Sequence, residues 1–157
     1  MESAKKVVKL LKEQKLHIST AESLTGGMLA SAIVDVEGAS NVFKEGYITY
    51  SDDVKHKVLG VSENDLKKYT AVSSIVAKQM AEGTVKITGS DIAVATTGYA
   101  GPDAADDGTK AGTVYIGIFY KGETDVRKFC FDGDRNSVRR QTVIEALNIT
   151  SEKLSNV

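Results

Sequence analysis

The chain has 157 residues, with 20 Lys and Arg against 21 Asp and Glu, and 41% of its residues are hydrophobic. This is typical of a globular domain large enough to bury a full hydrophobic core. The net charge of −1 argues against a protein that binds nucleic-acid backbones, because such proteins carry a basic excess. The single cysteine, Cys130, excludes an intramolecular disulfide, and two distant histidines provide no cluster for zinc. We expect neither a metal nor another cofactor.

The sequence shows no apolar segment typical of a signal peptide or of a membrane span. The N-terminal residues lead into an amphipathic segment, unlike the apolar run of a signal peptide. No apolar stretch approaches the roughly 18 to 20 residues that span a bilayer. We therefore predict a cytoplasmic protein without membrane contact, and a single domain over residues 1–157.

The first third of the chain predicts two helices and two strands. Hydrophobic residues recur at helical spacing over residues 3–14, so a surface helix is expected there. Residues 16–21 alternate and are rich in β-branched side chains, which predicts a strand. A tight turn and a helical pattern over residues 28–33 follow, and residues 47–50 predict a second strand.

The middle of the chain predicts three helices and a buried strand. Polar residues suited to N-caps begin helical patterns over 51–59, 62–69 and 73–88. The nearly continuous apolar run 91–97 is typical of a central strand that is covered on both faces. It opens into a glycine-rich loop over residues 98–112.

The last third predicts a hairpin of strands 113–120 and 126–131, followed by a helix from an Asp134 cap to about Lys153. Helices alternate with the early strands and the hairpin comes late. This order predicts an α/β fold, a three-layer α/β/α sandwich around a mixed, mostly parallel sheet of about five strands.

A serine stands where the first predicted strand meets the second predicted helix. Ser23 ends the strand, and Thr25, Gly26 and Gly27 lead into the helix. Backbone N–H groups at a helix start face outward and suit an anion or a developing oxyanion, and glycines let a ligand approach the main chain. The alternative is an N-cap serine on a close-packed turn.

A nucleophilic serine needs a base, and a lysine serves when burial lowers its pKa. Lys55 and Tyr50 follow the second predicted strand. If the first two strands are parallel neighbours, both residues emerge at the same sheet edge as Ser23. The alternatives are a solvated helix lysine and a half-buried strand aromatic.

Two further segments suit an anionic small molecule. Thr97, Gly98 and Gly101 follow the third predicted strand, where hydroxyls and amides can hold a substrate, although an ordinary polar loop is the alternative. Arg135 and Arg139 share a face of the last helix and are able to fork one phosphate. Surface salt bridges with nearby aspartates are the alternative for these arginines. Together the clusters suggest hydrolysis of an amide or ester.

Seven motifs, in order and spacing, resemble the CinA C-terminal domain family over about residues 7–147. These motifs are Thr20-Ala-Glu-Ser-x-Thr-Gly-Gly27, Tyr50-Ser-x-x-x-Lys55, Leu59-Gly-Val61, Ala71-Val-Ser73, Thr97-Gly-x-Ala-Gly-Pro102, Gly112-Thr-Val114 and Gly133-Asp-Arg135-x-x-Val-Arg-Arg140. Active members of that family are nicotinamide-nucleotide amidases.

The resemblance implies metal-independent serine hydrolysis of nicotinamide mononucleotide, which gives nicotinic acid mononucleotide and ammonia in pyridine-nucleotide salvage. It implies that Ser23 is the nucleophile, Lys55 the general base, and Tyr50 a hydroxyl that assists it. Thr97, the loop 98–101 and Arg135 match substrate-binding positions. Larger family members carry an additional N-terminal domain. By contrast, we expect this chain to be a stand-alone amidase, and the resemblance implies a homo-oligomer.

This sequence departs from the family pattern at two places. Leu24 stands where the family commonly has cysteine, which we expect to affect only packing. The family typically has Lys-Pro-Val-Gly-Thr after its glycines, whereas residues 103–111 have a different sequence here. This loop contains three aspartates, whose negative charges disfavour a bound phosphate unless Lys110 compensates. The alternative to the amidase is therefore a catalytically silent or diverged nucleotide-binding or interaction module on the same fold.

Overall fold

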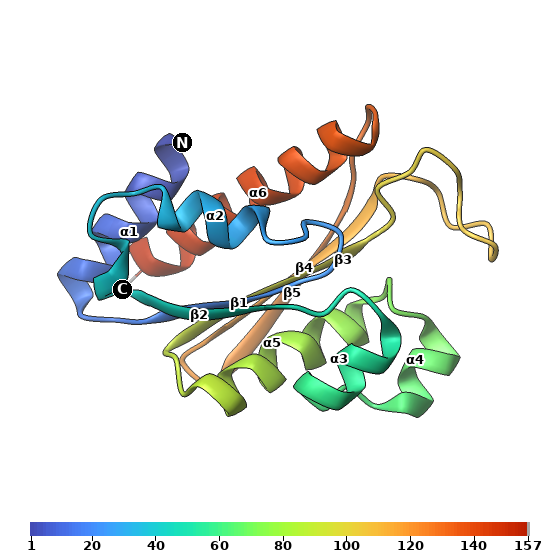
Figure 1. Ribbon diagram of the computed structural model, residues 1–157, viewed down its shortest axis with the longest axis horizontal. Coiled ribbons are helices and arrows are strands. Elements are labelled where there is room, and N and C mark those ends of the chain that lie inside the picture. Colours follow the sequence, from blue (N-terminus) through green and yellow to red (C-terminus); the bar gives the residue numbers. More distant parts are fainter. Residues whose placement is uncertain (157) are drawn as a thin grey trace.

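The computed structural model (Figure 1) describes residues 1–156 and has a sheet between two layers of helices. The helices are α1 (Glu2–Gln14), α2 (Met28–Val34), α3 (Asp52–Leu59), α4 (Glu63–Tyr69), α5 (Ser74–Thr88) and α6 (Arg135–Ser155), with a 3₁₀ turn η1 (Ala39–Asn41). The strands are β1 (Ile18–Glu22), β2 (Phe43–Ile48), β3 (Ile92–Gly98), β4 (Thr113–Tyr120) and β5 (Glu123–Cys130). No helix in residues 1–156 is long and apolar enough to cross a membrane.

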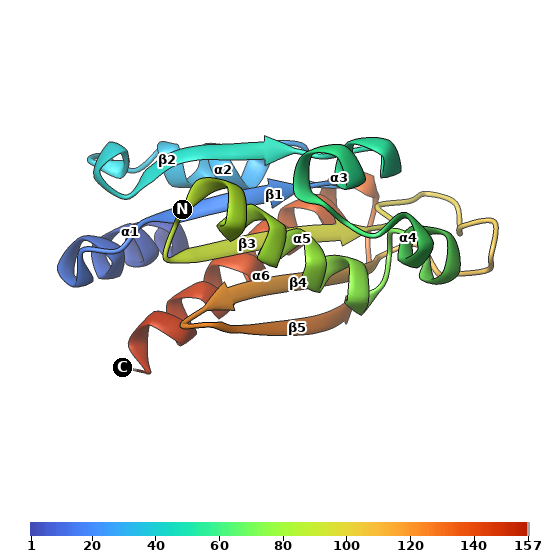
Figure 2. The ribbon, with the colours of Figure 1, turned by 90° about the horizontal axis from the view of Figure 1, so that it is seen from below.

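The strands lie in the order β2-β1-β3-β4-β5, as Figure 2 shows. β1 pairs in parallel with both β2 and β3, whereas β4 is antiparallel to β3 and β5. Among the five strands of residues 1–156, four therefore run in one direction and β4 is reversed. The mixed, mostly parallel sheet expected from the sequence is confirmed.

Helices cover both faces of this sheet. α1, α2 and α6 lie on one face, and α3, α4 and α5 lie on the other (Figure 1). β1 is buried throughout and β3 is buried except at its last residue, as expected for central strands between helical layers. The core under α1 includes Val7, Leu11, Ile92 and Leu147, all at most 1% exposed. The three-layer sandwich is confirmed.

Two strands differ from their predicted bounds by more than two residues. β2 spans Phe43–Ile48 instead of residues 47–50, because it is an edge strand whose mostly exposed side chains carry little hydrophobic signal. β5 begins at Glu123 instead of Val126, because Lys121 and Gly122 alone make the turn. Both turn residues have positive φ, 52° and 80°, the conformation that matches the twist of a two-residue hairpin.

The topology brings the carboxyl ends of β2, β1 and β3 to one edge of the sheet, beyond which the loop after β3 extends (Figure 1).

Close packing beneath this edge fixes the helix that follows β2. A Cβ atom at Gly83 of α5 would collide with the Leu59 carbonyl oxygen of α3. Glycine thus allows the two helices to touch, which holds α3 against the sheet.

Candidate active site

Three parallel strands end around one cleft of about 540 Å³. Ser23 follows β1, Tyr50 follows β2, and Thr97 lies near the end of β3. The carboxyl edge of a parallel sheet is the usual ligand site of open α/β folds. Of the residues predicted from the sequence, the cleft brings together Ser23, Tyr50, Lys55, Thr97, Gly98, Gly101 and Arg135.

Lys55 and Ser23 contact each other inside this cleft. The Lys55 Nζ lies 3.0 Å from the Ser23 Oγ, and their residues are 1% and 7% exposed. The same Nζ donates to the carbonyl oxygens of Thr49, at 2.8 Å, and Tyr50, at 3.2 Å. The amine therefore has three oxygen partners.

These three partners suit both protonation states of the amine. A charged ammonium has three N–H donors for the three oxygens. A neutral amine has two N–H donors, which the carbonyls of Thr49 and Tyr50 accept, and its lone pair then faces the Ser23 hydroxyl. The geometry is that of a base placed to accept the proton of Ser23.

Burial lowers the pKa of Lys55 from its ordinary value to about 8, while the negative charge of Asp52 acts in the opposite direction. In the structure, burial is the cause. At pH 7 about a tenth of the amine is then neutral, compared with a vanishing fraction for a free lysine.

The position of Lys55 follows from the cap of α3. The Ser51 side chain accepts the Val54 N–H at the start of the helix, and Asp52 and Asp53 occupy its first turn. Lys55 then falls on the helix face that looks toward the sheet. Its long side chain reaches the end of β1, so the lysine is not the solvated helix residue of the alternative interpretation.

Glu22 caps α2 with its side chain, which the sequence analysis did not predict. It is 1% exposed, and its carboxylate accepts the N–H groups of Gly27, Leu29 and Ala30 at 2.8 to 3.2 Å. The expectation that the amides at the start of α2 face outward for a ligand is therefore wrong, because a buried side chain of the same motif occupies them. The other side chains of β1 include Ser19 and Thr20, so a polar residue at its end gives no signal of this cap.

Thr25, Gly26 and Gly27 do not line the cleft. The Thr25 hydroxyl bonds to the Thr96 hydroxyl at 2.8 Å. Gly26 and Gly27 have φ values of +54° and +100°, which glycine adopts without strain, and they lie against side chains of α6 and β2. The two glycines shape the turn after Ser23.

Arg135 bridges two walls of the cleft. Its guanidinium donates to the Gly101 carbonyl at 2.8 Å and to the Tyr50 hydroxyl at 3.1 Å. Tyr50 is 61% exposed. The Lys55 amine contacts the backbone carbonyl of Tyr50, so the phenol orients the arginine and not the base.

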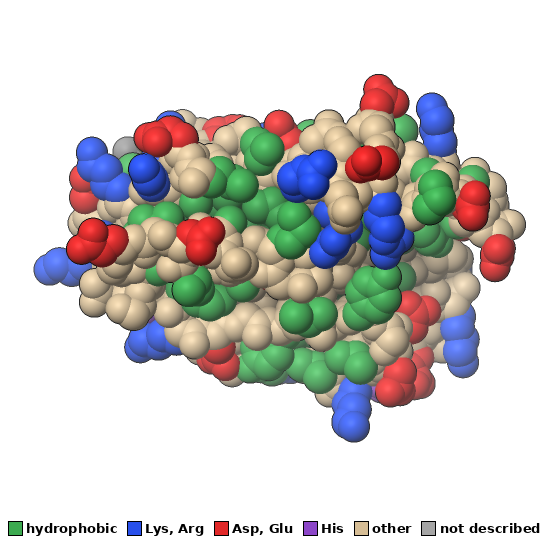
Figure 3. All heavy atoms as spheres, turned by 45° about the horizontal axis from the view of Figure 1, so that its top comes forward, with side chains coloured by type: hydrophobic (Ala, Val, Ile, Leu, Met, Phe, Trp, Pro, Cys, Tyr) green, Lys and Arg blue, Asp and Glu red, His purple; other side chains and the backbone are tan. Residues whose placement is uncertain are grey.

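Arg139 points elsewhere. Its Nε donates to the Leu24 carbonyl at 2.8 Å and its Nη2 to the Thr25 carbonyl at 3.4 Å. The two arginines share one end of α6, where Figure 3 shows basic side chains gathered, but their guanidinium groups have separate partners. The fork of both arginines around one phosphate is not preformed.

Thr97 links β3 to the loop before α5, because its hydroxyl donates to the Ala71 carbonyl at 2.8 Å. That loop contributes a wall that the sequence analysis did not assign to the site. The wall is formed by Thr70, Ala71 and Val72 of that loop, together with Leu66 of α4. Within residues 1–156, no group of three or more His, Cys, Asp or Glu side chains is placed to hold a metal ion.

Comparison with known proteins gives one family. The model of the CinA C-terminal domain matches residues 1–154. The chain belongs to the CinA C-terminal domain family. The family model and the seven sequence motifs thus indicate the same family.

Solved structures of family proteins have nearly the same fold. A CinA superfamily protein from Klebsiella pneumoniae is 35% identical with a TM-score of 0.97, over 99% of this chain and 98% of that one. A competence/damage inducible protein from Agrobacterium tumefaciens is 33% identical with a TM-score of 0.93, over 98% and 94% of the two chains.

Longer relatives also match. A CinA-like protein from Thermotoga neapolitana is 46% identical over 141 residues, which are 90% of this chain and 34% of that protein. A Clostridium novyi protein named for competence-damage induction is 50% identical over 139 residues, 88% of this chain and 34% of its own. The chain spans about a third of the length of these curated relatives.

Proposed function

We propose that the chain is an amidohydrolase that converts nicotinamide mononucleotide to nicotinic acid mononucleotide and ammonia, without a metal, in pyridine-nucleotide salvage. The observation that carries this proposal is the contact of 3.0 Å between the buried Lys55 amine and the Ser23 hydroxyl in an open cleft. A binding module has no need of a nucleophile beside a base whose pKa burial lowers to about 8.

The reaction begins when the neutral Lys55 amine takes the proton of the Ser23 hydroxyl. The serine oxygen bonds to the carboxamide carbon, and the C=O π electrons move onto the oxygen. When the C=O bond re-forms, the C–N bond breaks, and the proton on Lys55 goes to the nitrogen so that ammonia leaves. A water molecule then attacks the acyl-enzyme with Lys55 again as base, which releases the acid and restores Ser23.

Charges around the cleft support a substrate that is positive at one end and negative at the other. Nicotinamide mononucleotide has a cationic pyridinium ring and an anionic phosphate. Asp52 and Asp103 line the cleft and suit the ring, while Arg135 supplies a fork for the phosphate. The choice of this substrate among carboxamides rests on the resemblance of the seven motifs.

Ammonia release from nicotinamide mononucleotide by the purified protein, with a chelator present, tests the proposal. We expect turnover that persists in the chelator and disappears in Ser23→Ala. Tight binding of the mononucleotide without ammonia release would instead identify the silent binding module. Loss of turnover in the chelator would rule out the metal-independent mechanism.

A further inference from the structure

The turn that follows Ser23 contains two backbone N–H groups without a partner. Between residues 23 and 30 the other N–H groups have acceptors. These pairs are Ser23 to Thr96 O, Gly26 to Ser23 O, Met28 to Thr25 O, and Gly27, Leu29 and Ala30 to the Glu22 carboxylate. For the N–H groups of Leu24 and Thr25, residues 1–156 provide no acceptor.

These two groups belong to buried residues. Leu24 is 4% exposed and Thr25 is fully buried. Buried N–H groups without an acceptor are rare in folded proteins, because they lose water without gaining a hydrogen bond. Leu24 lines the cleft and Thr25 does not, so the N–H of Leu24 is the one that a ligand atom in the cleft can complete.

Contacts on the carbonyl side hold both peptide groups in place. The Ser23 carbonyl accepts the Gly26 N–H at 3.1 Å, and the Leu24 carbonyl accepts the Arg139 Nε at 2.8 Å. In a planar trans peptide the N–H points opposite to the C=O. The Thr25 N–H therefore points away from Arg139, and the peptide that carries it is anchored before any substrate arrives.

We propose that the N–H of Leu24 is the oxyanion donor of the amidase, with Arg139 as a positioning residue that anchors the turn after Ser23 through the Leu24 carbonyl. The inference rests on the proposed function. When the Ser23 Oγ bonds to the substrate carbon, the oxygen that receives the π electrons is attached to that same carbon and lies beside Ser23. The N–H of Ser23 itself is committed to Thr96 O at 3.0 Å, so it does not serve.

Two other amides of the cleft provide a matched comparison. For the N–H groups of Ala100 and Gly101, residues 1–156 also provide no acceptor, and both residues line the cleft. They belong to the loop after β3, however, whereas Leu24 is the covalent neighbour of the nucleophile. We assign Ala100 and Gly101 to substrate binding and Leu24 to the reaction itself.

Amide-to-ester replacement tests this division, because an α-hydroxy acid keeps the side chain and removes the N–H. An ester at position 24 should lower kcat by about 10²- to 10³-fold, the usual cost of one oxyanion donor. KM should change by less than about threefold, and the pH midpoint of the rate should stay near 8. The ester at Ala100 should raise KM instead, and the control ester at Gly122, an exposed turn residue outside the cleft, should leave both kcat and KM within about threefold of the wild type.

Arg139→Ala should lower kcat in the same way with an unchanged pH midpoint, and Arg139→Lys should restore part of the rate because an ammonium can still donate to the Leu24 carbonyl. Full kcat in the position 24 ester, or a large loss of kcat confined to the Ala100 ester, would overturn the assignment.

A labelling experiment separates this inference from the proposed function. A fluorophosphonate reacts as the Ser23 Oγ bonds to phosphorus, fluoride leaves, and charge grows on the phosphoryl oxygen. If the wild type labels at Ser23 but releases no ammonia from the mononucleotide, the substrate is wrong, and the oxyanion donor is supported when the position 24 ester labels at least about 100-fold more slowly. Equal labelling rates would overturn it, as would a wild type that neither labels nor hydrolyses.

Discussion

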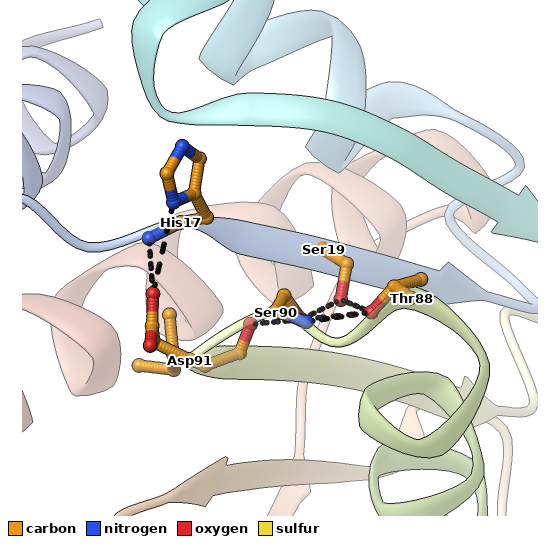
Figure 4. A network of polar contacts seen from close by, with 6 residues as sticks. His17, Ser19, Thr88, Ser90 and Asp91 are labelled. Carbon is orange, nitrogen blue, oxygen red and sulfur yellow. Dashed lines mark hydrogen bonds and ion pairs between the residues drawn. The ribbon is translucent and has the colours of Figure 1, made fainter.

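Serine hydroxyls lie toward both ends of β1, and their surroundings differ. At the amino end, the Ser19 Oγ bonds to Ser90 at 2.6 Å and to Thr88 at 3.2 Å, so its partners are other hydroxyls (Figure 4). At the carboxyl end, the partner of Ser23 is the amine of Lys55. A hydroxyl network satisfies a buried oxygen, whereas an amine with a lowered pKa can remove its proton.

The histidine near Ser19 adds to the comparison between the two ends of β1. His17 is close to Ser19 in sequence, but its backbone N–H and its ring face Asp91, at 2.8 and 3.8 Å from the Oδ2. Figure 4 shows the imidazole directed away from the three hydroxyls. A serine, a histidine and an aspartate are thus neighbours without forming a relay, and the less familiar lysine occupies the position of the base.

Paired alanine variants should separate the two ends most strongly. Ser23→Ala should lower kcat by more than about 10³-fold, because the nucleophile is lost, while the free energy of unfolding changes by at most about 1 to 2 kcal/mol. Ser19→Ala should do the reverse, with normal kcat and a loss of about 1 kcal/mol of stability. Ammonia release and urea unfolding measure both. Activity above a few percent in Ser23→Ala would exclude Ser23 as nucleophile.

Lys55→Arg should be nearly as damaging, because arginine keeps a positive charge but does not lose its proton in this pH range. In the wild type the rate should rise with pH through a midpoint near 8, as the neutral amine forms, and should be insensitive to EDTA. A kcat profile over pH 6 to 10 checks this. Near wild-type kcat in Lys55→Arg would show that another group accepts the proton.

The sequence predicted the cleft because topology, more than side-chain detail, brings its parts together. Ser23, Tyr50 and Thr97 follow three strands, and once those strands are parallel neighbours their ends must meet. Apolar runs and N-cap residues were sufficient to locate β1, β3 and most of the helices. The edge strand β2 was placed less well, because exposed side chains remove the pattern that marks a buried strand.

Side-chain partners were harder to predict, because spacing along a helix defines a face but not the direction of a long side chain. Arg135 and Arg139 are four residues apart, yet one reaches Tyr50 and the other reaches Leu24. Glu22 was missed for the same reason, since nothing in its position shows that its carboxylate turns back to cap α2.

Arg135→Ala tests whether Arg135 binds the phosphate or only holds the cleft walls together, and the expected effect is intermediate in size. If Arg135 gives up its contact with Gly101 or Tyr50 to bind the phosphate, its loss should raise KM for the mononucleotide by about 10- to 100-fold. The riboside, which has no phosphate, should be a poor substrate of both proteins to a similar degree. Arg140→Ala, an exposed arginine outside the cleft, is the control. Equal losses on both substrates would mean that Arg135 mainly holds Gly101 and Tyr50 together.

Stability should also report on the buried amine. Because the pKa of Lys55 is about 8 in the folded state and near 10.5 in the unfolded state, the unfolded chain binds more protons between these values, and stability rises with pH there. Relative to Lys55→Met, the wild type should gain about 2 kcal/mol between pH 7 and pH 10. Urea unfolding at both pH values measures the difference, in which other titrating groups cancel. A constant difference would mean that the lysine is solvated.

The smallest effect concerns the two aspartates at the start of α3. Asp52 lines the cleft, and its charge raises the pKa of Lys55 against the effect of burial, whereas Asp53 lies outside the cleft lining. Both occupy the first turn of α3 and interact favourably with its dipole, so replacing either costs similar stability. Asp52→Asn should therefore move the midpoint of the pH–rate profile below the wild-type value, giving more activity at pH 7, while Asp53→Asn should leave it in place. Equal midpoints in the two variants would show that Asp52 does not act on the base. A shift confined to Asp52→Asn would establish that the proton acceptor at the carboxyl end of β1 is the amine of Lys55.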